Sequence, residues 1–503
     1  MNISNLLAMQ ARKFPNHEGI VTPKERISYA EWDKAVNQLA DGLRTLGISK
    51  GDKVVLHMPN TKELIYSYFA VQRLGALSIP INAKLAEKEI QFIVTHSDAK
   101  MLITHNMLFP SIEHMKLDPS ITYVKTGAAV FDWRSLDDIL LNGSTSSIEC
   151  LSSDDDEASI LYTSGTTGDP KGVVFTHRNI LTVGIMMAIE MNITPDSRLL
   201  HMMPLSHSAP LHLFLIAGTY AGATHIVTPT FTPELFLHTV ATERTTHFFG
   251  APIAYLAGAA HDKLADYDLS SMTHWVYGGA PLDQSKVDFI QQKFQTDRLY
   301  CVYGLTEAGP NGTVLMGTEH ANKAGSIGKR AALNCEIRLV DEDGKDVIKG
   351  EIGEIILAGE GNMKGYYKAE ELTKATLKEG WLYTGDMAYQ DEDDYYWVVD
   401  RKKDIIISGG VNIYPQDIEK ELITHPAVDD VAVVGVPNPD WGETVKAFVV
   451  LKEPIDGDLA EDFKTYLTGK IASYKIPRLV EELDALPRNV TGKLLKSHLR
   501  NLV

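Results

Sequence analysis

The feature that most constrains the fold of this chain is the alternation of short apolar segments with longer segments of helical periodicity. KVVLHM from Lys53 and THIVTP from Thr224 are strand-like, whereas EWDKAVNQLADGLRTLG from Glu31 and PELFLHTVATERT from Pro233 place apolar residues three or four positions apart. Strands that alternate with helices predict repeated βα units around parallel sheets. The sequence therefore predicts a large α/β body.

Toward the carboxyl terminus the pattern changes twice. From about Leu333 the segments become short strands, and DEDG at 341–344 has the composition of a tight hairpin turn, so we expect a small β subdomain. Beyond Lys403 a strand, a helix, a pair of strands and another helix follow one another, which predicts a compact α+β unit of about a hundred residues. We place the boundary between this unit and the preceding part of the chain at Asp400 to Asp404.

Length, charge and hydropathy exclude several classes of protein. At 503 residues the chain is too long for a single ordinary core, and its net charge of −18 disfavours nucleic-acid binding, because phosphate backbones attract a basic surface. No stretch of about eighteen residues is apolar throughout, so we expect no membrane span, while peripheral membrane contact and a homodimer stay open. The start, MNISNLLAMQARKFP, lacks the features of a secretory signal and predicts a cytoplasmic protein.

Residues 162–172 read YTSGTTGDPKG and form the strongest motif in the chain. The neighbouring runs ILY and VVF are strand-like, so we expect a loop between two strands. It is not a Walker A loop, because that motif needs a glycine directly before the lysine and a helix after it. Gly165 and Gly168 leave backbone N–H groups accessible to an anion, Lys171 adds a positive charge, and hydroxyl donors come from Thr163, Ser164, Thr166 and Thr167. This composition suits a mobile polyphosphate.

The same string, with Thr176 and His177 after it, resembles the phosphate-binding signature of the adenylate-forming (ANL) superfamily, which includes the acyl-CoA synthetases. Further motifs follow in the order that this family keeps: PLSHSAPLH from Pro204, GGAPL from Gly278, YGLTE from Tyr303, YTGD from Tyr383, DRKKDIIISGG from Asp400 and PRNVTGK from Pro487. Their order over essentially the whole length indicates the acyl-CoA synthetase (fatty acid–CoA ligase) family. The resemblance implies an α/β amino-terminal domain over 1–400, with two βα-layered subdomains and a small β-barrel at 331–400, and a mobile α+β domain over 401–503.

The resemblance also implies an activity, namely ATP- and Mg²⁺-dependent activation of a carboxylic acid as acyl-AMP, with transfer to coenzyme A and release of AMP and pyrophosphate. An anionic acid that attacks an anionic α-phosphate needs positive charge in the site. Glu307 lies in an otherwise uncharged segment, where an unpaired carboxylate is costly unless it meets a cation. By resemblance Glu307 is the Mg²⁺ ligand, and Thr306 lies beside the α-phosphate.

Two groups of residues are expected around the nucleoside. A flat surface with little side-chain bulk, against which a purine can lie, is expected from Gly278, Gly279, Ala280 and Pro281, and the family adds Tyr303 and Gly304 around adenine. Asp386 is a short acceptor in a turn, of the kind that binds ribose hydroxyls, and Arg401 can add a donor to the same sugar. These residues complete an expected ATP site.

The carboxyl-terminal unit supplies the remaining expected residues. Lys493 follows a glycine turn in a basic tail, and by resemblance it contacts the acid carboxylate and the α-phosphate during adenylate formation. Lys403 occupies the family's hinge position, where backbone torsions absorb a rotation of the small domain. That rotation implies that Ser408, Gly409 and Gly410 meet the large domain, where the glycines let the pantetheine arm of coenzyme A pass close to the backbone.

The identity of the acid is less constrained. His207 matches the position that borders the acyl pocket in acyl-CoA synthetases, and Ser208 stands where amino-acid-activating relatives usually have an aspartate, so an α-amino acid is disfavoured. The segments HFFGAPIAYLAG and VYGGAPL, expected around the acyl group, are apolar. A medium- or long-chain fatty acid is therefore the first expectation. An aryl or other organic acid, and an acyl-AMP ligase that loads a carrier protein, are the alternatives.

Overall fold

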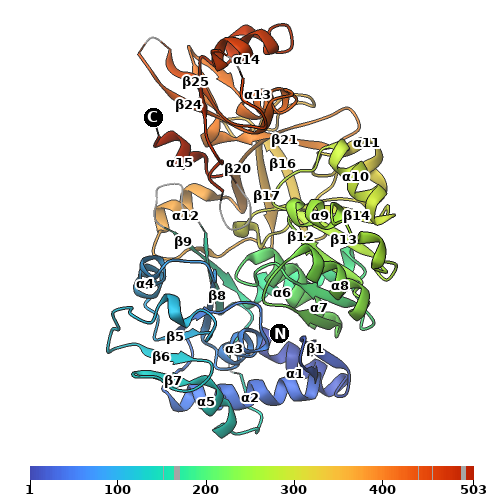
Figure 1. Cartoon of the computed structure of the whole chain (residues 1–503). Coiled ribbons are helices and arrows are strands. Elements are labelled where there is room, and N and C mark those ends of the chain that lie inside the picture. Colours follow the sequence, from blue (N-terminus) through green and yellow to red (C-terminus); the bar gives the residue numbers. More distant parts are fainter. Residues whose placement is uncertain (151, 164–169, 440, 456, 489–493, 503) are drawn as a thin grey trace. The chain divides into compact units, whose positions relative to one another are not determined.

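The computed structural model describes residues 1–150, 152–163, 170–439, 441–455, 457–488 and 494–502. Contacts among the described residues divide the chain into two compact units (Figure 1). The first unit comprises Met1–Ile337 and Leu357–Leu382, and the second comprises Arg338–Ile356 and Tyr383–Val503. The domain boundary placed near residue 400 from the sequence stays a prediction.

The first unit contains a sheet with the strand order β15-β14-β13-β12-β10-β11-β1-β2. Neighbouring strands from β14 to β1 run parallel, whereas β15 and β2 are antiparallel to their neighbours at the two ends. The strands are β1 (Glu18–Val21), β2 (Arg26–Ser28), β10 (Arg198–His201), β11 (Thr224–Val227), β12 (His247–Gly250), β13 (His274–Gly278), β14 (Leu299–Gly304) and β15 (Gly312–Leu315). We refer to it as the first sheet.

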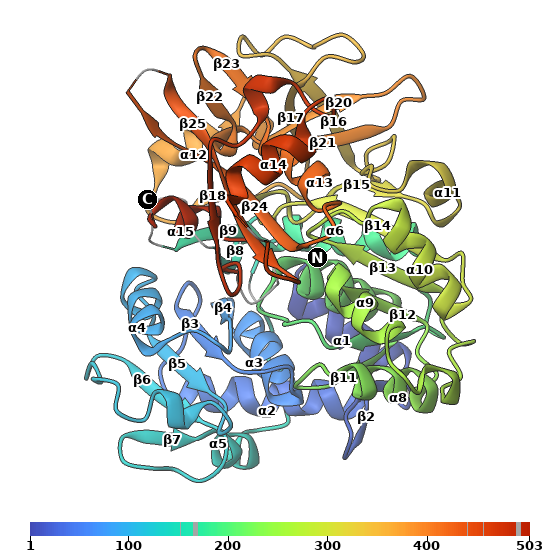
Figure 2. The same cartoon turned by 45° about the horizontal axis from the view of Figure 1, so that its top comes forward.

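A second sheet of the same unit has the order β18-β9-β8-β4-β3-β5-β6-β7 (Figure 2). Its strands from β8 to β7 run parallel, β9 is antiparallel to β8, and β18 is antiparallel to β9. The strands are β3 (Lys53–His57), β4 (Leu77–Ile81), β5 (Met101–Thr104), β6 (Thr122–Lys125), β7 (Trp133–Ser135), β8 (Glu157–Thr163), β9 (Lys171–Thr176) and β18 (Gly365–Tyr366).

Helices connect these strands, as the alternating pattern predicted. They are α1 (Ile3–Lys13), α2 (Tyr29–Thr45), α3 (Lys62–Arg73), α4 (Glu87–His96), α5 (Leu136–Asn142), α6 (His177–Glu190), α7 (Ala217–Ala221), α8 (Pro233–Glu243), α9 (Pro252–Ala259), α10 (Gln284–Phe294), α11 (His320–Lys323) and α12 (Glu370–Thr376). A π-helix, η2 (Ala209–Ile216), precedes α7. Buried side chains of α6, η2, β13 and β14 share one apolar cluster, which includes Val183, Leu213, Val276 and Val302.

The turn from β9 into α6 shows why Thr176 and His177 follow the glycine-rich motif. The Thr176 hydroxyl accepts a hydrogen bond from Asn179 N at 3.2 Å, and Asn179 Oδ1 accepts one from Thr176 N at 2.9 Å. This reciprocal cap satisfies backbone donors at the start of the helix and ends the strand sharply. His177 is fully buried, and its Nδ1 accepts a hydrogen bond from Ile3 N at 3.3 Å. These two residues therefore have structural roles.

The second unit has a sheet with the order β23-β22-β25-β24, with β26 parallel to β25. Its elements are β22 (Ile406–Ser408), β23 (Val411–Ile413), α13 (Pro415–Leu422), β24 (Val428–Asn438), β25 (Gly442–Leu451), α14 (Leu459–Leu467), β26 (Leu479–Glu482) and α15 (Lys496–Arg500). The strands that precede them along the chain are β16 (Cys335–Val340), β17 (Gly353–Gly359), β19 (Leu377–Lys378), β20 (Trp381–Gln390) and β21 (Tyr396–Arg401). Within the unit, β20 and β21 pair antiparallel, and Ile418, Val433 and Phe463 belong to its apolar core.

The structure confirms the elements expected in the carboxyl-terminal part of the chain. The DEDG turn is closed by a hydrogen bond of 2.8 Å from Asp341 N to Lys345 O, and Gly344 has a φ of +78°. The order expected beyond Lys403 is observed from β22 to α14, except that two short strands, β22 and β23, stand where one strand was expected. Of the helices that the structure describes, none is both long enough and apolar enough to span a bilayer.

Candidate active site

Several predicted motifs follow parallel strands of the first sheet at their carboxyl ends. Residues 204–208 follow β10, Gly278 ends β13, and Gly304 ends β14. The strands β10, β12, β13 and β14 are successive neighbours and run in the same direction. Because carboxyl ends of parallel strands lie at one edge of a sheet, motifs that are far apart in sequence meet there. We call this the carboxyl edge of the first sheet.

Close backbone approach explains two of the glycines at this edge. A Cβ atom at Gly278 would lie 2.7 Å from a backbone oxygen of β14, and a Cβ atom at Gly304 would lie 2.0 Å from the Pro310 backbone oxygen. Gly279 has a φ of +84° and open space around it. The flat surface expected from the sequence is present as a short exposed run of Gly279, Ala280 and Pro281.

Thr306 and Glu307 lie in a 3₁₀ turn, η4 (Thr306–Ala308), one residue after β14 ends. The Ser208 hydroxyl donates a hydrogen bond to Thr306 Oγ1 at 3.3 Å. Ser208 is buried, and Thr306 is half-buried. The contact therefore joins the motif that follows β10 to the motif that follows β14, as the expected site requires.

The Glu307 side chain contacts Tyr366, and Tyr366 in turn contacts Lys171. The Tyr366 hydroxyl donates a hydrogen bond to Glu307 Oε1 at 2.8 Å, and Lys171 Nζ lies 5.8 Å from the centre of the Tyr366 ring. Tyr366 belongs to β18, which pairs with β9 at Val173 and Val174, two and three positions after Lys171. The structure thus brings together Lys171 and Glu307, which the sequence analysis selected, through Tyr366, which it did not.

The phosphate-binding motif is described at both of its ends. Thr163 ends β8 and Lys171 begins β9, and these two residues face each other across the antiparallel pair. This confirms that the motif joins two strands. The predicted residues Ser164, Gly165, Thr166, Thr167 and Gly168 lie outside the described residues, and so does Lys493.

The surroundings of His207 disfavour its protonated form. Asn82 Nδ2 lies 3.2 Å from His207 Nε2, and the surrounding protein lowers the pKa of His207 by desolvation. An amide nitrogen can only donate, so His207 Nε2 accepts this bond and carries no proton. Asn82 directly follows β4 of the second sheet, and the sequence analysis missed it.

A second asparagine, Asn60, forms hydrogen bonds to the backbone of the loop that carries His207. Asn60 Oδ1 accepts a hydrogen bond from Leu205 N at 2.9 Å, and its Nδ2 donates to Met203 O at 2.8 Å. Asn60 is 5% exposed. Since a buried amide with two backbone partners fixes the path of a loop, Asn60 positions residues 203–207. The sequence contains no local signal for this role.

An apolar gap lies beside Tyr303 and between η2, α6, β14 and β15. Its empty space is about 170 Å³, too narrow to admit a water molecule. The lining residues are Met186, Met187, Leu213, Val302, Tyr303, Pro310, Asn311, Gly312, Thr313, Val314 and Ala332, which include no charged side chain. Methionine side chains adapt readily to irregular space, so this lining can open around an apolar group.

In the second unit, the predicted ribose-binding pair is formed. Asp386 and Arg401 face each other across β20 and β21, and Arg401 Nε lies 2.8 Å from Asp386 Oδ1. Arg401 Nη1 also donates to Thr384 O at 3.1 Å. The two side chains are therefore fixed next to each other, and their binding of ribose stays a prediction.

The expected hinge lies in a short 3₁₀ turn, η6 (Lys402–Asp404). Arg500 of α15 donates to Asp404 Oδ1 at 2.8 Å and to Lys403 O at 3.4 Å. Burial raises the pKa of the Asp400 carboxyl, just before this turn, to about 6. The turn is thus connected to the last helix of the unit, while its role as a hinge stays a prediction.

Ser408, Gly409 and Gly410 form the turn between β22 and β23. Both glycines have positive φ, at +57° and +80°. A Cβ atom at Gly409 would lie 2.7 Å from the Trp441 ring, so the absence of a side chain is required there. The space beside Gly409 is thus taken by the Trp441 ring, whereas Gly410 has open space, and the passage of the pantetheine arm along this segment stays a prediction.

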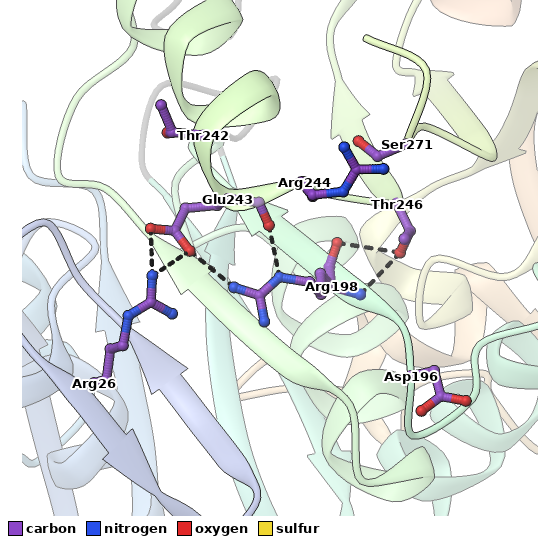
Figure 3. Close-up of a pocket in the computed structure, with 8 residues that line it drawn as sticks. All are labelled: Arg26, Asp196, Arg198, Thr242, Glu243, Arg244, Thr246 and Ser271. Atoms are coloured by element: carbon purple, nitrogen blue, oxygen red, sulfur yellow. Dashed lines mark hydrogen bonds and ion pairs between the residues drawn. The ribbon is translucent and has the colours of Figure 1, made fainter. Parts of the chain in front are cut away.

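A charged cleft of about 530 Å³ lies at the opposite edge of the first sheet (Figure 3). Arg198 begins β10 and Arg26 begins β2, and both pair with Glu243 at 2.8 and 2.9 Å. The same two arginines also pair with Glu18 at 2.8 and 3.0 Å. Their charge is therefore matched by carboxylates of the chain itself. We call this the amino edge of the first sheet.

The residues at the carboxyl edge fit a magnesium ion that a nucleotide brings with it. Among the described residues, no group of three or more His, Cys, Asp or Glu side chains could hold a metal ion. Mg²⁺ commonly uses one or two carboxylates together with substrate phosphates and water. Glu307 supplies one carboxylate beside the motif expected to bind phosphate, and this is consistent with such a site.

Comparisons with known proteins agree with this geometry. The family model described as AMP-binding enzyme matches residues 7–367, and the model described as AMP-binding enzyme C-terminal domain matches residues 417–493. Feruloyl-CoA synthase of Amycolatopsis sp is 36% identical and is matched over 98% of this chain and 97% of its own length. The long-chain-fatty-acid–CoA ligase FadD13 of Mycobacterium tuberculosis is 33% identical, with 99% and 98% covered.

Solved structures show the same fold. The crystal structure of ATP-bound MatB from Rhodopseudomonas palustris has a TM-score of 0.89 and 30% identity, and the match covers 100% of this chain and 99% of that one. The anthranilate CoA ligase AuaEII in complex with anthranoyl-AMP has a TM-score of 0.89 and 28% identity, with 100% and 97% covered. The chain therefore belongs to the acyl-CoA synthetase family of the adenylate-forming superfamily, and it is an AMP-forming acid–thiol ligase.

Proposed function

We propose that the acid activated by this ligase has an apolar, uncharged body, and that it is a medium- or long-chain fatty acid. The observation that carries the proposal is the gap beside Tyr303, whose lining includes no charged side chain. A charged tail would lose its hydration there without meeting an opposite charge, which is costly. An aliphatic tail can instead displace the adaptable side chains of Met186 and Met187.

The neutral state of His207 and the identity of Ser208 support the same class of acid. An uncharged imidazole can still donate one hydrogen bond through its remaining N–H, but it offers no positive charge to a second carboxylate of the acid. The Ser208 hydroxyl donates a hydrogen bond to Thr306 Oγ1 at 3.3 Å. Because Ser208 carries no negative charge, it would not attract the ammonium group of an amino acid. Dicarboxylic acids and α-amino acids are thus disfavoured relative to simple acids.

We infer that the carboxyl edge performs adenylation. Bound Mg²⁺ would neutralise phosphate charge, and Glu307 is the residue that would hold it. Lys171, at the start of β9, would add a positive charge near the leaving phosphates, and Thr306 would donate its hydroxyl near the α-phosphate. Lys493 would stabilise the charge that develops at the α-phosphate, as the family resemblance implies.

The second half-reaction is assigned to residues of the second unit. Asp386 and Arg401 would hold the ribose while the acyl group moves to the thiol of coenzyme A. A rotation at Lys403 would remove Lys493 and bring in Ser408, Gly409 and Gly410, of which Gly410 has open space that would give room to the pantetheine arm.

An aryl acid is the second candidate. It is favoured by the relatives at 36% identity, which are named feruloyl-CoA synthase, and by a relative at 33% identity that is named indoleacetate–CoA ligase. Phe249, at the carboxyl end of β12, stacks on Phe214 of η2 with ring centres 5.4 Å apart, and this surface could receive a further ring.

The assay that tests the proposal measures thioester formation with ATP, Mg²⁺ and coenzyme A across saturated acids from two to eighteen carbons, ferulate, benzoate and indoleacetate. We expect the highest kcat/KM for an aliphatic acid of medium or long chain. A maximum with an aromatic acid selects the second candidate. Adenylate that is transferred only to a phosphopantetheine carrier protein, and never to coenzyme A, overturns coenzyme A as the acceptor.

A partial-reaction assay tests the two-step assignment. We expect Lys493→Ala to lower acid-dependent pyrophosphate exchange by about 100- to 1,000-fold, because one positioned charge is lost from the transition state. Thioester formation from synthetic acyl-AMP should be nearly unchanged. An equal loss in both assays contradicts the separate use of Lys493 in the first step.

A further inference from the structure

The segment GYYK, residues 365–368, lies beside the candidate active site and has no role in the proposed chemistry so far. Its first tyrosine, Tyr366, is half-buried and donates its hydroxyl proton to Glu307 Oε1 at 2.8 Å. This length is the ordinary one for a hydrogen bond from a hydroxyl group. Tyr366 therefore restricts the direction in which the Glu307 carboxylate points.

The backbone around this contact is fixed from two sides. Tyr366 pairs with Val173 in the register of β18 and β9, which places it two positions from Lys171 along the neighbouring strand. On the other side, Met363 N donates a hydrogen bond to Glu307 O at 2.8 Å. The hydroxyl and the carboxylate thus meet on a rigid frame.

The ring of Tyr366 also contacts a positively charged side chain, that of Lys171. Lys171 Nζ lies 5.8 Å from its centre, within the range of a cation–π contact. Such a contact is weak at a partly exposed site, so the ammonium group is held near the phosphate motif and can still leave the ring. One side chain therefore contacts both the expected metal ligand and the expected phosphate-binding cation.

The next residue provides a matched comparison within the same strand region. Tyr367 also donates its hydroxyl to a carboxylate, Asp98 Oδ2, at 2.8 Å. Asp98 is exposed and is further paired with Lys368 at 2.8 Å. The two adjacent tyrosines thus make the same type of bond, one inside the candidate site and one on the surface.

We propose that Tyr366 is a positioning residue that orients the Glu307 carboxylate for the metal ion of a metal–ATP complex. The inference rests on the proposed role of Glu307. Without the hydroxyl, the carboxylate can rotate and must be ordered again when the metal binds. Hydrogen-bond partners of metal ligands typically contribute about 10- to 100-fold to metal affinity, which sets the expected size of the effect.

The test compares Tyr366→Phe with Tyr367→Phe in the full-length protein. Phenylalanine keeps the ring that contacts Lys171, so the first variant reports on the hydroxyl alone. Binding of Mn²⁺–ATP is followed by water-proton relaxation, and binding of ATP without metal, in the presence of EDTA, by calorimetry. We expect Tyr366→Phe to weaken Mn²⁺–ATP binding by about 10- to 100-fold and metal-free ATP binding by less than twofold. Tyr367→Phe should leave both within about twofold.

The outcomes separate this inference from the proposed function. Unchanged Mn²⁺–ATP binding in Tyr366→Phe overturns the positioning role, and so does an equal loss with and without metal, which would indicate a structural defect. If the unmodified protein forms no acyl-adenylate from any acid in the panel, the proposed function fails instead.

If Tyr366→Phe does not fold, a second measurement can be made that keeps the hydrogen bond between Tyr366 and Glu307. Incorporation of 3-fluorotyrosine at position 366, and separately at 367, gives two ¹⁹F NMR signals. We expect the signal at 366 to shift on addition of Mg²⁺–ATP but not of ATP with EDTA, and the signal at 367 to stay unchanged. Equal responses at the two positions overturn the inference.

Discussion

The two edges of the first sheet differ in how their polar groups find partners. At the amino edge, Arg26 and Arg198 pair with Glu18 and Glu243 at 2.8 to 3.0 Å, so positive and negative charges balance within the chain. At the carboxyl edge, the neutral groups dominate, with the Ser208–Thr306 hydroxyl contact as an example. Strand β10 takes part in both regions, with Arg198 at its start and residues 204–208 after its end.

This difference indicates where a charged substrate can bind. A group that is already paired must give up its partner before it can bind a ligand, and the ligand then has to replace that interaction. The carboxyl edge has open backbone at Gly279 and exchangeable contacts around Glu307 and Lys171. It can therefore receive charge that ATP brings with it, while the larger cleft at the amino edge is occupied by its own ion pairs.

The largest expected effect comes from a carboxylate at the carboxyl edge. We expect Glu307→Ala to lower the rate of acyl-adenylate formation by about 100-fold or more, because the Mg²⁺–ATP complex loses its protein ligand. The measurement is acid-dependent pyrophosphate exchange at saturating ATP, with the metal concentration varied. A rate within threefold of the unmodified enzyme would remove Glu307 from the site.

The next largest expected effect is a loss of folding stability at acidic pH, caused by buried histidines of the first sheet. Burial lowers the pKa of His201 to about 3 and that of His247 to about 4, below the value of 6.5 for an unperturbed histidine. Below pH 6.5 the unfolded chain binds protons that the folded protein does not, so stability that is complete above this pH is lost as pH falls toward 4. At pH 5 each such histidine lowers the free energy of unfolding by at most about 2 kcal/mol.

Urea unfolding at pH 7.5 and pH 5 measures this loss, and His247→Gln is the variant that should reduce it. The ion pairs of the amino edge do not account for it, because Glu18 stays charged. Burial raises the pKa of Glu18, but hydrogen bonds from Arg198 and Arg26 outweigh this and lower it overall. Equal free energies of unfolding at the two pH values contradict the prediction.

A smaller effect is expected when the Glu243 carboxylate at the amino edge is removed. Glu243→Ala leaves Arg26 and Arg198 with Glu18 alone, which should lower the free energy of unfolding by about 1 to 2 kcal/mol. The adenylation rate should stay within twofold, since no ligand is assigned there. A loss of activity as large as that of Glu307→Ala, at unchanged stability, would show that the two edges do not differ in function.

Local sequence patterns predicted much of the fold and part of this contrast. Alternating segments gave the strands β3, β8, β9 and β11 and the helices α2 and α8 where they are observed. The glycine-rich motif was correctly placed between two strands, because apolar runs flank it closely. The family resemblance placed Gly278, Gly304 and Glu307 in one candidate site, and the parallel strands explain why these residues share one edge.

The residues that the sequence did not reveal act through distant partners. Tyr366 is separated from Glu307 by 59 positions, and Asn82 from His207 by 125. An asparagine or tyrosine has the same local appearance whether it is exposed or holds a site, and its role depends on where the strands place it. The same holds for the saturated ion pairs of the amino edge, since Arg26 and Glu243 are 217 positions apart.

The smallest expected effect concerns a single hydroxyl at each edge. Ser208 donates to Thr306 Oγ1 at 3.3 Å at the carboxyl edge, and Ser271 donates to Thr245 O at 2.8 Å beside the amino-edge cleft. A neutral hydrogen bond contributes about 0.5 to 1 kcal/mol, so Ser208→Ala should lower the adenylation rate about two- to fivefold by releasing the Thr306 hydroxyl. Ser271→Ala removes a shorter bond and should change stability by a similar amount, with kcat and KM unchanged. If both variants lose activity equally, the loss reflects general destabilisation of the sheet, and the hydroxyl of Ser208 has no specific role in aligning Thr306.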